Sequence, residues 1–212
     1  MKAAPPSEAL RLLEEAYPSA PQVALDYETP LQLLIATVLS AQCTDQRVNI
    51  VTKTLFRKYK TAKDYAEADI KALEAGIRST GFYHNKARNI KAAAGMIVNE
   101  YGGNVPETME DLLRLPGVAR KTANIVLTAA FGKVEGIAVD THVRRLSQRI
   151  GLSSSDDPVR IEADLMGKCP RDAWPKINKL LVAHGRQVCQ AKKPMCNGCV
   201  LAGICLKIGV NA

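Results

Sequence analysis

Apolar residues recur at helical spacing along almost the whole chain. The run LQLLIATVLSA at 31–41 is almost entirely apolar. A helix that is apolar on all sides is normally buried, so we expect the helix that starts at Thr29-Pro30 to lie at the centre of a core. No segment alternates strictly between apolar and polar residues in the manner of a strand, apart from the weak stretch VEGIAV at 134–139. We therefore predict an all-α fold.

Further amphipathic segments follow, separated by glycines, prolines and Thr or Asp caps. Each carries apolar residues three or four positions apart on one face. The predicted helices cover about 48–59, 70–77, 90–101, 108–113, 120–131, 141–150 and 172–188, and one more begins at Asp157-Pro158.

A tight connection, Leu115-Pro116-Gly117-Val118, joins two of these helices. Pro116 restricts one φ and Gly117 can adopt a positive φ, which favours a helical hairpin. The first amides of the next helix have no partner within that helix, and the helix dipole adds positive charge there, so a phosphate could bind. The alternative is an ordinary helix connection with Leu115 and Val118 packed inside.

Two residues near the hairpin could carry chemistry. Lys121 follows Arg120 at the start of an apolar helix, where backbone amides and Arg120 disfavour a second positive charge. It is a candidate nucleophile, although a surface lysine that contacts phosphate has the same pattern. Asp140 lies 19 residues later, just before another helix. Its position is typical of an N-cap, and a catalytic acid could occupy the same place.

Six cysteines are present, and four of them fall within 17 residues near the C-terminus. Such clustering indicates metal binding rather than a disulfide framework. The spacing Cys-x6-Cys-x2-Cys-x5-Cys is compatible with a tetrahedral zinc site and with a [4Fe–4S] cluster. The four candidates are Cys189, Cys196, Cys199 and Cys205, and we expect Cys43 and Cys169 to be ordinary buried thiols.

Positive charge is concentrated in the last part of the chain. The whole sequence has a net charge of +8, and residues 168–212 contain eight basic side chains and one acidic one. Such a segment favours a polyanion, first of all nucleic acid, although a solvated surface is an equal alternative. The N-terminal stretch has no long apolar core, and no run approaches a membrane span. We expect a cytoplasmic protein, nucleoid-associated if bacterial.

Taken together, the motifs LPGVARKTAN, VDTHV, LLIATVLSAQCTD and STGFYHNKARNI and the cysteine spacing resemble the helix-hairpin-helix base-excision DNA glycosylases. The resemblance covers nearly the whole chain. It implies two helical domains with a DNA-binding groove between them. A six-helix barrel domain with the hairpin would cover 22–134, and an iron–sulfur cluster domain would combine 1–21 with 135–212.

The resemblance also implies roles for individual residues. Lys121 matches the lysine that forms a Schiff base, Asp140 matches the catalytic aspartate, and the four cysteines would hold a [4Fe–4S] cluster. Gln42 would fill the gap left by a flipped nucleotide, Phe82 would wedge into the opposite strand, and the lysines between the first two cysteines would meet phosphates. The expected DNA contacts are Gln42, Phe82, Leu115, Pro116, Gly117, Val118, Ala119, Arg120, His142, Lys192 and Lys193.

The implied function is that of a monomeric bifunctional DNA glycosylase and AP lyase. It would bind double-stranded DNA with damaged bases or abasic sites, and would remove oxidised pyrimidines by β-elimination through a lysine Schiff base. Two alternatives are a glycosylase with another lesion preference and a DNA-binding iron–sulfur redox sensor with weak or lost catalysis.

One position departs from the family pattern, because Ala119 stands where the hairpin usually has a second glycine. A methyl group there could crowd the approaching phosphate or stiffen the turn. We therefore expect weaker DNA binding or an altered substrate range, without loss of activity. We predict that Ala119→Gly binds duplex DNA more tightly than the parent when both are titrated at one salt concentration. Equal affinities would contradict the prediction.

Overall fold

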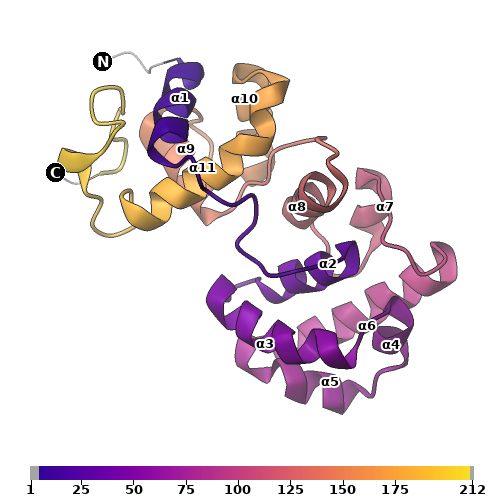
Figure 1. The fold of residues 1–212 in the computed structure, drawn as a ribbon. Coiled ribbons are helices and arrows are strands. Elements are labelled where there is room, and N and C mark those ends of the chain that lie inside the picture. Colours follow the sequence, from indigo (N-terminus) through magenta and orange to yellow (C-terminus); the bar gives the residue numbers. More distant parts are fainter. Residues whose placement is uncertain (1–4, 211–212) are drawn as a thin grey trace. The chain divides into compact units, whose positions relative to one another are not determined.

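The computed structural model describes residues 5–210, and these residues form helices joined by turns and loops, with no strand among them (Figure 1). The all-α prediction is confirmed, and 134–139 is not a strand. None of the described helices is long and apolar enough to span a membrane. The α-helices are α1 Pro6–Ala16, α2 Pro30–Leu39, α3 Asp45–Lys58, α4 Ala62–Glu67, α5 Ile70–Ile77, α6 Tyr83–Glu100, α7 Met109–Arg114, α8 Arg120–Phe131, α9 Thr141–Ile150, α10 Pro158–Lys168 and α11 Trp174–Gln187, and the short 3-10 helices are η1 Arg78–Thr80, η2 Arg171–Ala173 and η3 Cys196–Gly198.

Internal contacts divide the chain into two compact units. The discontinuous unit combines the N-terminal segment up to Gln22 with the chain from Gly136 onward, and the continuous unit covers Val23–Glu135. The roles expected from the sequence, a barrel domain and a cluster domain, stay predictions.

Helix α2 is the centre of the continuous unit, as its apolar run predicts. Leu33 and Leu34 pack with residues of α8 in one cluster, while Ile35 and Leu39 pack with α3, α5 and α6 in another. Because α2 supplies side chains to both clusters, seven of its ten residues are buried. The hairpin and the turn after α2 are therefore both anchored to the same helix.

The discontinuous unit is held together by packing between the two ends of the sequence. Leu10 and Leu13 of α1 are buried in one cluster with Leu146 of α9, Leu165 of α10 and Leu181 of α11. Glu14 of α1 also pairs with Lys176 of α11 at 2.6 Å. The N-terminal helix is thus part of the core that supports the cysteine-rich segment.

Some elements differ from the sequence-based expectation. Helix α4 was not predicted, although Thr61 and Asp64 form a capping box at its start. At the start of α2 a capping box is only half present, because the Thr29 side chain accepts from the Gln32 amide while the Gln32 side chain accepts from the amide of Glu28. Cys169 is buried as expected, whereas Cys43 is only partly buried.

Candidate nucleic-acid interface and cysteine cluster

The predicted hairpin lies between α7 and α8. Leu115 and Val118 are buried, and the Val118 amide donates to the Leu115 carbonyl at 3.1 Å. Gly117 has a φ of 81°, and a Cβ there would approach Asn89 of α6 to 2.9 Å. Both the backbone conformation and the close approach therefore require glycine at this position. Leu115 and Val118 pack inside, as expected of an ordinary helix connection. A phosphate could therefore bind only through the first-turn amides of α8.

The start of α8 has no side-chain cap. Ala119 is its N-cap residue and supplies no acceptor for the first-turn amides. Ala119 itself has φ −98° and ψ 170°, an extended conformation open to any residue, so alanine causes no backbone strain. Any cost of this residue must therefore come from its exposed methyl group and not from the turn.

The capping pattern separates α6 and α8 from the other α-helices of the continuous unit. In the described chain from Val23 to Glu135, these are the only two α-helices that begin without a side-chain cap, and the 3-10 helix η1 also lacks one. An uncapped N-terminus keeps its amides available for an external anion. The capped helices are α2, α3, α4, α5 and α7, with Thr29, Thr44, Thr61, Asp69 and Thr108 as their caps.

Lys121 and Asp140 lie in different units. Lys121 is partly buried in the first turn of α8. Asp140 is the N-cap of α9, and its Oδ1 accepts from the amides of His142 at 2.9 Å and Val143 at 2.8 Å. The Oδ2 atom of Asp140 lies 3.2 Å from Nδ1 of His142. The N-cap interpretation is confirmed, and it holds this carboxylate in a defined orientation.

Gln42 and Phe82 both occupy strained turns. Gln42 follows α2 with a φ of 52°, and Phe82 precedes α6 with a φ of 47°. Left-handed φ values cost a residue with a Cβ about 1–3 kcal/mol, and they concentrate at functional sites. Both side chains are exposed, and that of Phe82 has 63% of its surface open to solvent. An exposed phenylalanine in a left-handed conformation does not add to the stability of the fold. Its presence is therefore better explained by a function.

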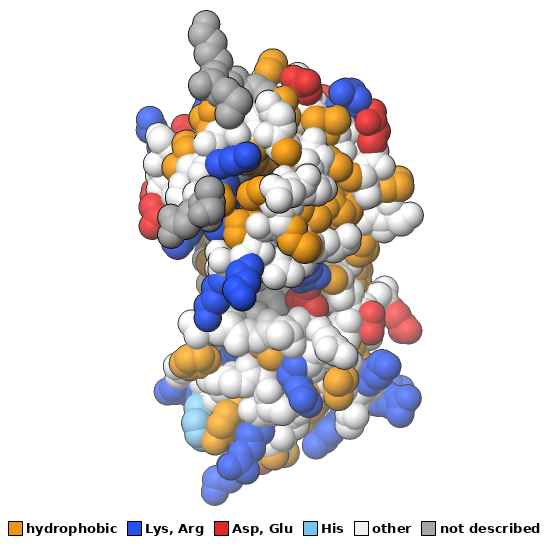
Figure 2. Space-filling view, turned by 90° about the vertical axis from the view of Figure 1, so that its left-hand side faces the viewer, with side chains coloured by type: hydrophobic (Ala, Val, Ile, Leu, Met, Phe, Trp, Pro, Cys, Tyr) orange, Lys and Arg blue, Asp and Glu red, His pale blue; other side chains and the backbone are white. Residues whose placement is uncertain are grey.

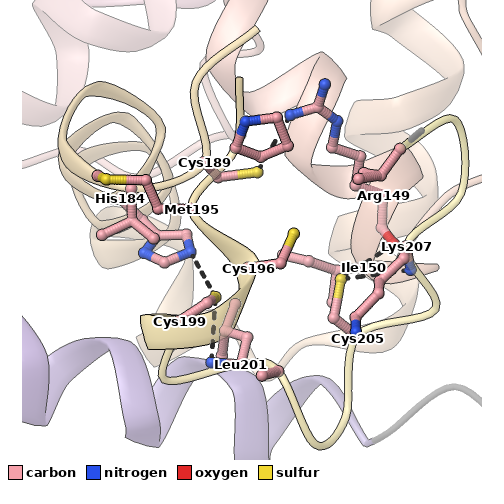
Figure 3. Close-up of a pocket in the computed structure, with 14 residues that line it drawn as sticks. Arg149, Ile150, His184, Cys189, Met195, Cys196, Cys199, Leu201, Cys205 and Lys207 are labelled. Atoms are coloured by element: carbon pink, nitrogen blue, oxygen red, sulfur yellow. Dashed lines mark hydrogen bonds between the residues drawn. The ribbon is translucent and has the colours of Figure 1, made fainter. Parts of the chain in front are cut away.

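The four C-terminal cysteines line one cavity of the discontinuous unit (Figure 3). All four are unpaired and partly buried. Burial raises the pKa of the Cys199 and Cys205 thiols, so a bound cation would be needed to keep them as thiolates at neutral pH. Within residues 5–210, no group of three or more His, Cys, Asp or Glu side chains has the spacing to hold a single metal ion.

Arg149 of α9 joins the cysteine segment to the helical core. Its side chain is 7% exposed, and Nη1 donates to Sγ of Cys189 at 3.3 Å. The guanidinium also donates to the carbonyls of Gln190 at 2.8 Å and Ala191 at 2.9 Å. The Arg149 carbonyl accepts from Cys205 Sγ at 3.3 Å. One buried arginine therefore contacts the first and the last of the four cysteines.

His184 of α11 contacts a third cysteine. Its Nε2 lies 3.3 Å from Sγ of Cys199, and its Nδ1 lies 2.8 Å from the hydroxyl of Tyr17. Burial lowers the pKa of His184 to about 4, so the ring is neutral near pH 7. A neutral imidazole has one donor and one acceptor nitrogen. If the Tyr17 hydroxyl donates to Nδ1, Nε2 donates to the sulfur, which stabilises a thiolate.

Lys192 and Lys193 lie on the exposed loop between Cys189 and Cys196. The Arg149 contacts to the two preceding carbonyls fix the start of that loop. Basic side chains are also visible on the face of the protein in Figure 2, where blue Lys and Arg groups are more prominent than red acidic groups. The loop therefore presents two positive charges from an anchored backbone.

Sequence reasoning did not identify three residues that the structure connects to these features. Arg149 and His184 both contact cysteine sulfurs, and Lys86 is a buried lysine of α6. The helical spacing within 172–188 predicts only that His184 faces the core. No local motif distinguishes Arg149 or Lys86 from the other basic residues, because the partners of Arg149, and Leu39 as one of the two partners of Lys86, lie far away in the sequence.

Comparison with known proteins places this architecture in a family. Residues 35–171 match the HhH-GPD superfamily base excision DNA repair proteins. The chain is 54% identical to endonuclease III of Synechocystis sp. over 94% of its length and 90% of the relative's. It is 45% identical to endonuclease III of Bacillus subtilis over 90% of its length and 87% of that relative's.

Solved structures agree with the sequence matches. A trapped endonuclease III–DNA covalent intermediate, an estranged-adenine complex, superposes with a TM-score of 0.91 at 44% identity, covering 95% of this chain and 94% of that one. A non-covalent endonuclease III–DNA complex gives a TM-score of 0.90 at the same identity and coverage. The fold and sequence define a helix-hairpin-helix protein of base excision DNA repair. Within that superfamily, the chain belongs to the endonuclease III family.

The two hydrogen bonds to Asp140 Oδ1 predict how this position responds to substitution. Asp140→Ala removes the cap of α9 and should lower the free energy of unfolding by about 1 kcal/mol. Asp140→Asn keeps a side-chain oxygen at the same place and should change stability by only a few tenths of that. Urea unfolding followed by circular dichroism measures both. Equal stabilities of Asp140→Ala and the parent would show that the cap contributes nothing.

Proposed function

We propose that this protein removes oxidised pyrimidines from duplex DNA and then cuts the strand at the abasic site, as a bifunctional DNA glycosylase and AP lyase. The observation that carries the proposal is the 44% identity, along 95% of the chain, to an endonuclease III trapped as a covalent intermediate with DNA. A covalent bond to DNA requires a nucleophile on the protein. Lys121 has this chemistry and lies at the first turn of α8, next to the hairpin.

DNA binding would begin at the hairpin. The uncapped first turn of α8 offers backbone amides and the positive end of a helix dipole to one phosphate, with Arg120 beside it. Val118 and Leu115 keep that turn rigid by packing inside. His142, Lys192 and Lys193 would contact further backbone phosphates. Their contribution to affinity would not depend on base sequence and would decrease as the salt concentration rises.

A damaged nucleotide must leave the base stack before its sugar can be reached. Gln42 would occupy the space that this nucleotide vacates, and Phe82 would enter the opposite strand. Both lie exposed on turns with positive φ, where strain is more often linked to function than to stability. The pair would stabilise the open state of the duplex while chemistry takes place.

The chemistry would use Lys121 as the nucleophile. Its free amine attacks C1′ of the sugar, and the C1′–N bond breaks as the base leaves with the bonding electrons. Asp140 accepts the proton that the amine loses, or stabilises the positive charge that develops on the sugar. Ring opening yields a Schiff base, which acidifies the 2′ proton. Loss of that proton forms a double bond and expels the 3′ phosphate.

The role of Asp140 as an N-cap is compatible with this mechanism. Its Oδ1 is occupied by two backbone amides, while Oδ2 faces the ring of His142. Hydrogen bonds from amides favour the ionised form of a carboxylate, which is the form that can accept a proton. The helix that begins at Asp140 thus orients the group that would assist Lys121.

The cysteines that would hold a [4Fe–4S] cluster are Cys189, Cys196, Cys199 and Cys205. Three observations fit such a group: the four thiols line one cavity, Arg149 donates to Cys189, and neutral His184 can donate to Cys199. N–H donors to sulfur are typical around bound iron–sulfur clusters. When bound, the cluster would cross-link the C-terminal segment and hold the loop of Lys192 and Lys193 in place, without taking part in base removal.

The protein would act as a monomer in the cytoplasm, at the nucleoid in a bacterium. A DNA-binding iron–sulfur redox sensor without catalysis is the alternative from another class. It would bind abasic DNA but leave the strand intact.

The Schiff base can be tested by reduction. With borohydride present during turnover on DNA that contains an abasic site, we expect a stable covalent protein–DNA adduct. Lys121→Ala should form no adduct, because its side chain has no amine, and should still bind the DNA. Absence of the adduct in the parent, or its persistence in Lys121→Ala, would contradict the proposed Schiff-base mechanism. Lys133→Ala, a change in the loop after α8, serves as a matched control and should react like the parent.

The metal assignment can be tested separately. Cys199→Ser removes one thiolate and should lower the iron content of the purified protein, with loss of the visible absorption of the cluster. Cys43→Ser and Cys169→Ser are matched controls, since neither residue lines the cavity. They should keep the full iron content. If the parent protein contains one zinc ion per chain and no iron, the assignment of a [4Fe–4S] cluster is wrong.

A further inference from the structure

Lys86 of α6 is a buried charged residue that the catalytic scheme does not use. Only 5% of its surface is exposed. Its ammonium group donates to the carbonyl of Leu39 and to the carbonyl of Thr80, each at 2.8 Å. Leu39 is the last residue of α2 and Thr80 is the last residue of η1. One side chain therefore binds the ends of two segments that are distant in sequence.

At the end of α2, Lys86 completes a set of hydrogen bonds that the helix cannot make itself. The last four carbonyls of a helix have no partner within it. In α2, three of these four carbonyls accept hydrogen bonds from the turn that directly follows the helix. Only the carbonyl of Leu39 accepts from another segment. The four bonds are Ser40 N to Ala36 O at 2.9 Å, Ser40 Oγ to Thr37 O at 2.8 Å, Ala41 N to Val38 O at 3.4 Å, and Lys86 Nζ to Leu39 O at 2.8 Å.

Both carbonyls are followed by residues in strained conformations. Gln42 lies three residues after Leu39 and has a φ of 52°. Gly81 and Phe82 come directly after Thr80, with φ values of 70° and 47°. Left-handed conformations persist only where the surrounding structure holds them in place. The ammonium of Lys86 is the contact shared by the two turns that carry them.

The surroundings of Lys86 make this contact rigid. Leu39, Ile77 and Ala87 are fully or almost fully buried in one cluster, which joins α2, α5 and α6. Thr80 is 2% exposed, and its hydroxyl donates to the Ile77 carbonyl at 2.8 Å. An unpaired carbonyl or ammonium in such a place is costly. The two turns therefore cannot separate from each other without exposing or orphaning these groups.

We propose that Lys86 is a positioning residue that fixes the turns of Gln42 and Phe82 relative to each other, so that both side chains enter a damaged duplex as one unit. This inference rests on the proposed function, in which Gln42 fills the gap left by the extruded nucleotide and Phe82 enters the opposite strand. If the two turns were independent, Gln42 and Phe82 would each lose conformational freedom when they enter the duplex. Because one buried ammonium group fixes both turns, that freedom is already lost on folding, and binding is less costly.

The chain offers a comparison variant at a second lysine, which is partly buried and also bonds to a backbone carbonyl. Lys91 lies on the same helix and donates from Nζ to the carbonyl of Ala68, the C-cap residue of α4. Its contact has the same chemistry as those of Lys86, but it involves neither turn. A purely structural role predicts that Lys86→Met changes folding stability alone, whereas a positioning role predicts a loss of lesion preference in the folded protein that Lys91→Met does not show.

The test compares the parent, Lys86→Met and Lys91→Met at one salt concentration. Affinity is measured for an undamaged duplex and for the same duplex with a tetrahydrofuran abasic analogue. Base release from a duplex with thymine glycol is measured in single-turnover experiments. Fluorescence of a 2-aminopurine beside the lesion reports unstacking, and circular dichroism reports folding.

For Lys86→Met we expect an unchanged affinity for undamaged DNA, a smaller preference for the abasic analogue and a weaker 2-aminopurine signal. Base release should slow by about tenfold to a hundredfold, since a displacement of about 1 Å can have that effect. Lys91→Met should resemble the parent in every DNA measurement. Lys86→Arg, which keeps a cation with several donors, should recover part of the preference.

A folded Lys86→Met with the same preference and rate as Lys91→Met would overturn the inference. If Lys86→Met does not fold, Lys86→Gln takes its place with the same expectations, because its side chain is too short to reach both carbonyls. A parent protein that neither prefers the abasic analogue nor releases thymine glycol would instead contradict the proposed function. The two failures are therefore distinguishable.

Discussion

Every α-helix leaves amides at its start and carbonyls at its end without partners, and this protein depends on how those groups are satisfied. Most helix starts in the continuous unit are closed by a Thr or Asp side chain. Among its α-helices the exceptions are α6 and α8, which begin at the strained Phe82 turn and at the hairpin. Where a cap is missing, the first-turn amides remain able to bind an external anion. For α8 of this protein, we propose that this anion is a DNA phosphate.

The same constraint explains how the chemical role proposed for Asp140 can coincide with its structural role. A carboxylate that accepts two backbone amides is oriented and held at the start of a helix. These are also the properties required of a group that must accept a proton or stabilise a positive charge. The protein therefore needs no separate scaffold for its candidate acid, because α9 supplies one.

Buried cations satisfy the groups that the helices themselves cannot. Lys86 bonds to carbonyls at the ends of α2 and η1, and Arg149 bonds to two carbonyls and one sulfur at the start of the cysteine segment. Each of them connects an irregular segment to a packed helix. In both places the irregular segment carries the residues expected to meet DNA, namely Gln42 and Phe82 in one case and Lys192 and Lys193 in the other.

The sequence by itself determined the all-α fold, the hairpin with its glycine, the candidate pair Lys121 and Asp140, and the four cysteines. All of these depend on short-range patterns, such as helical periodicity, a turn dipeptide or the spacing of one residue type. Only the tertiary structure revealed that Ala119 is unstrained, that Gln42 and Phe82 have positive φ, and that Lys86, Arg149 and His184 contact the turns and thiols. The backbone angles are not fixed by residue type, and most of the side-chain contacts join segments far apart in the chain. No local pattern encodes which buried side chain will meet which backbone carbonyl or sulfur.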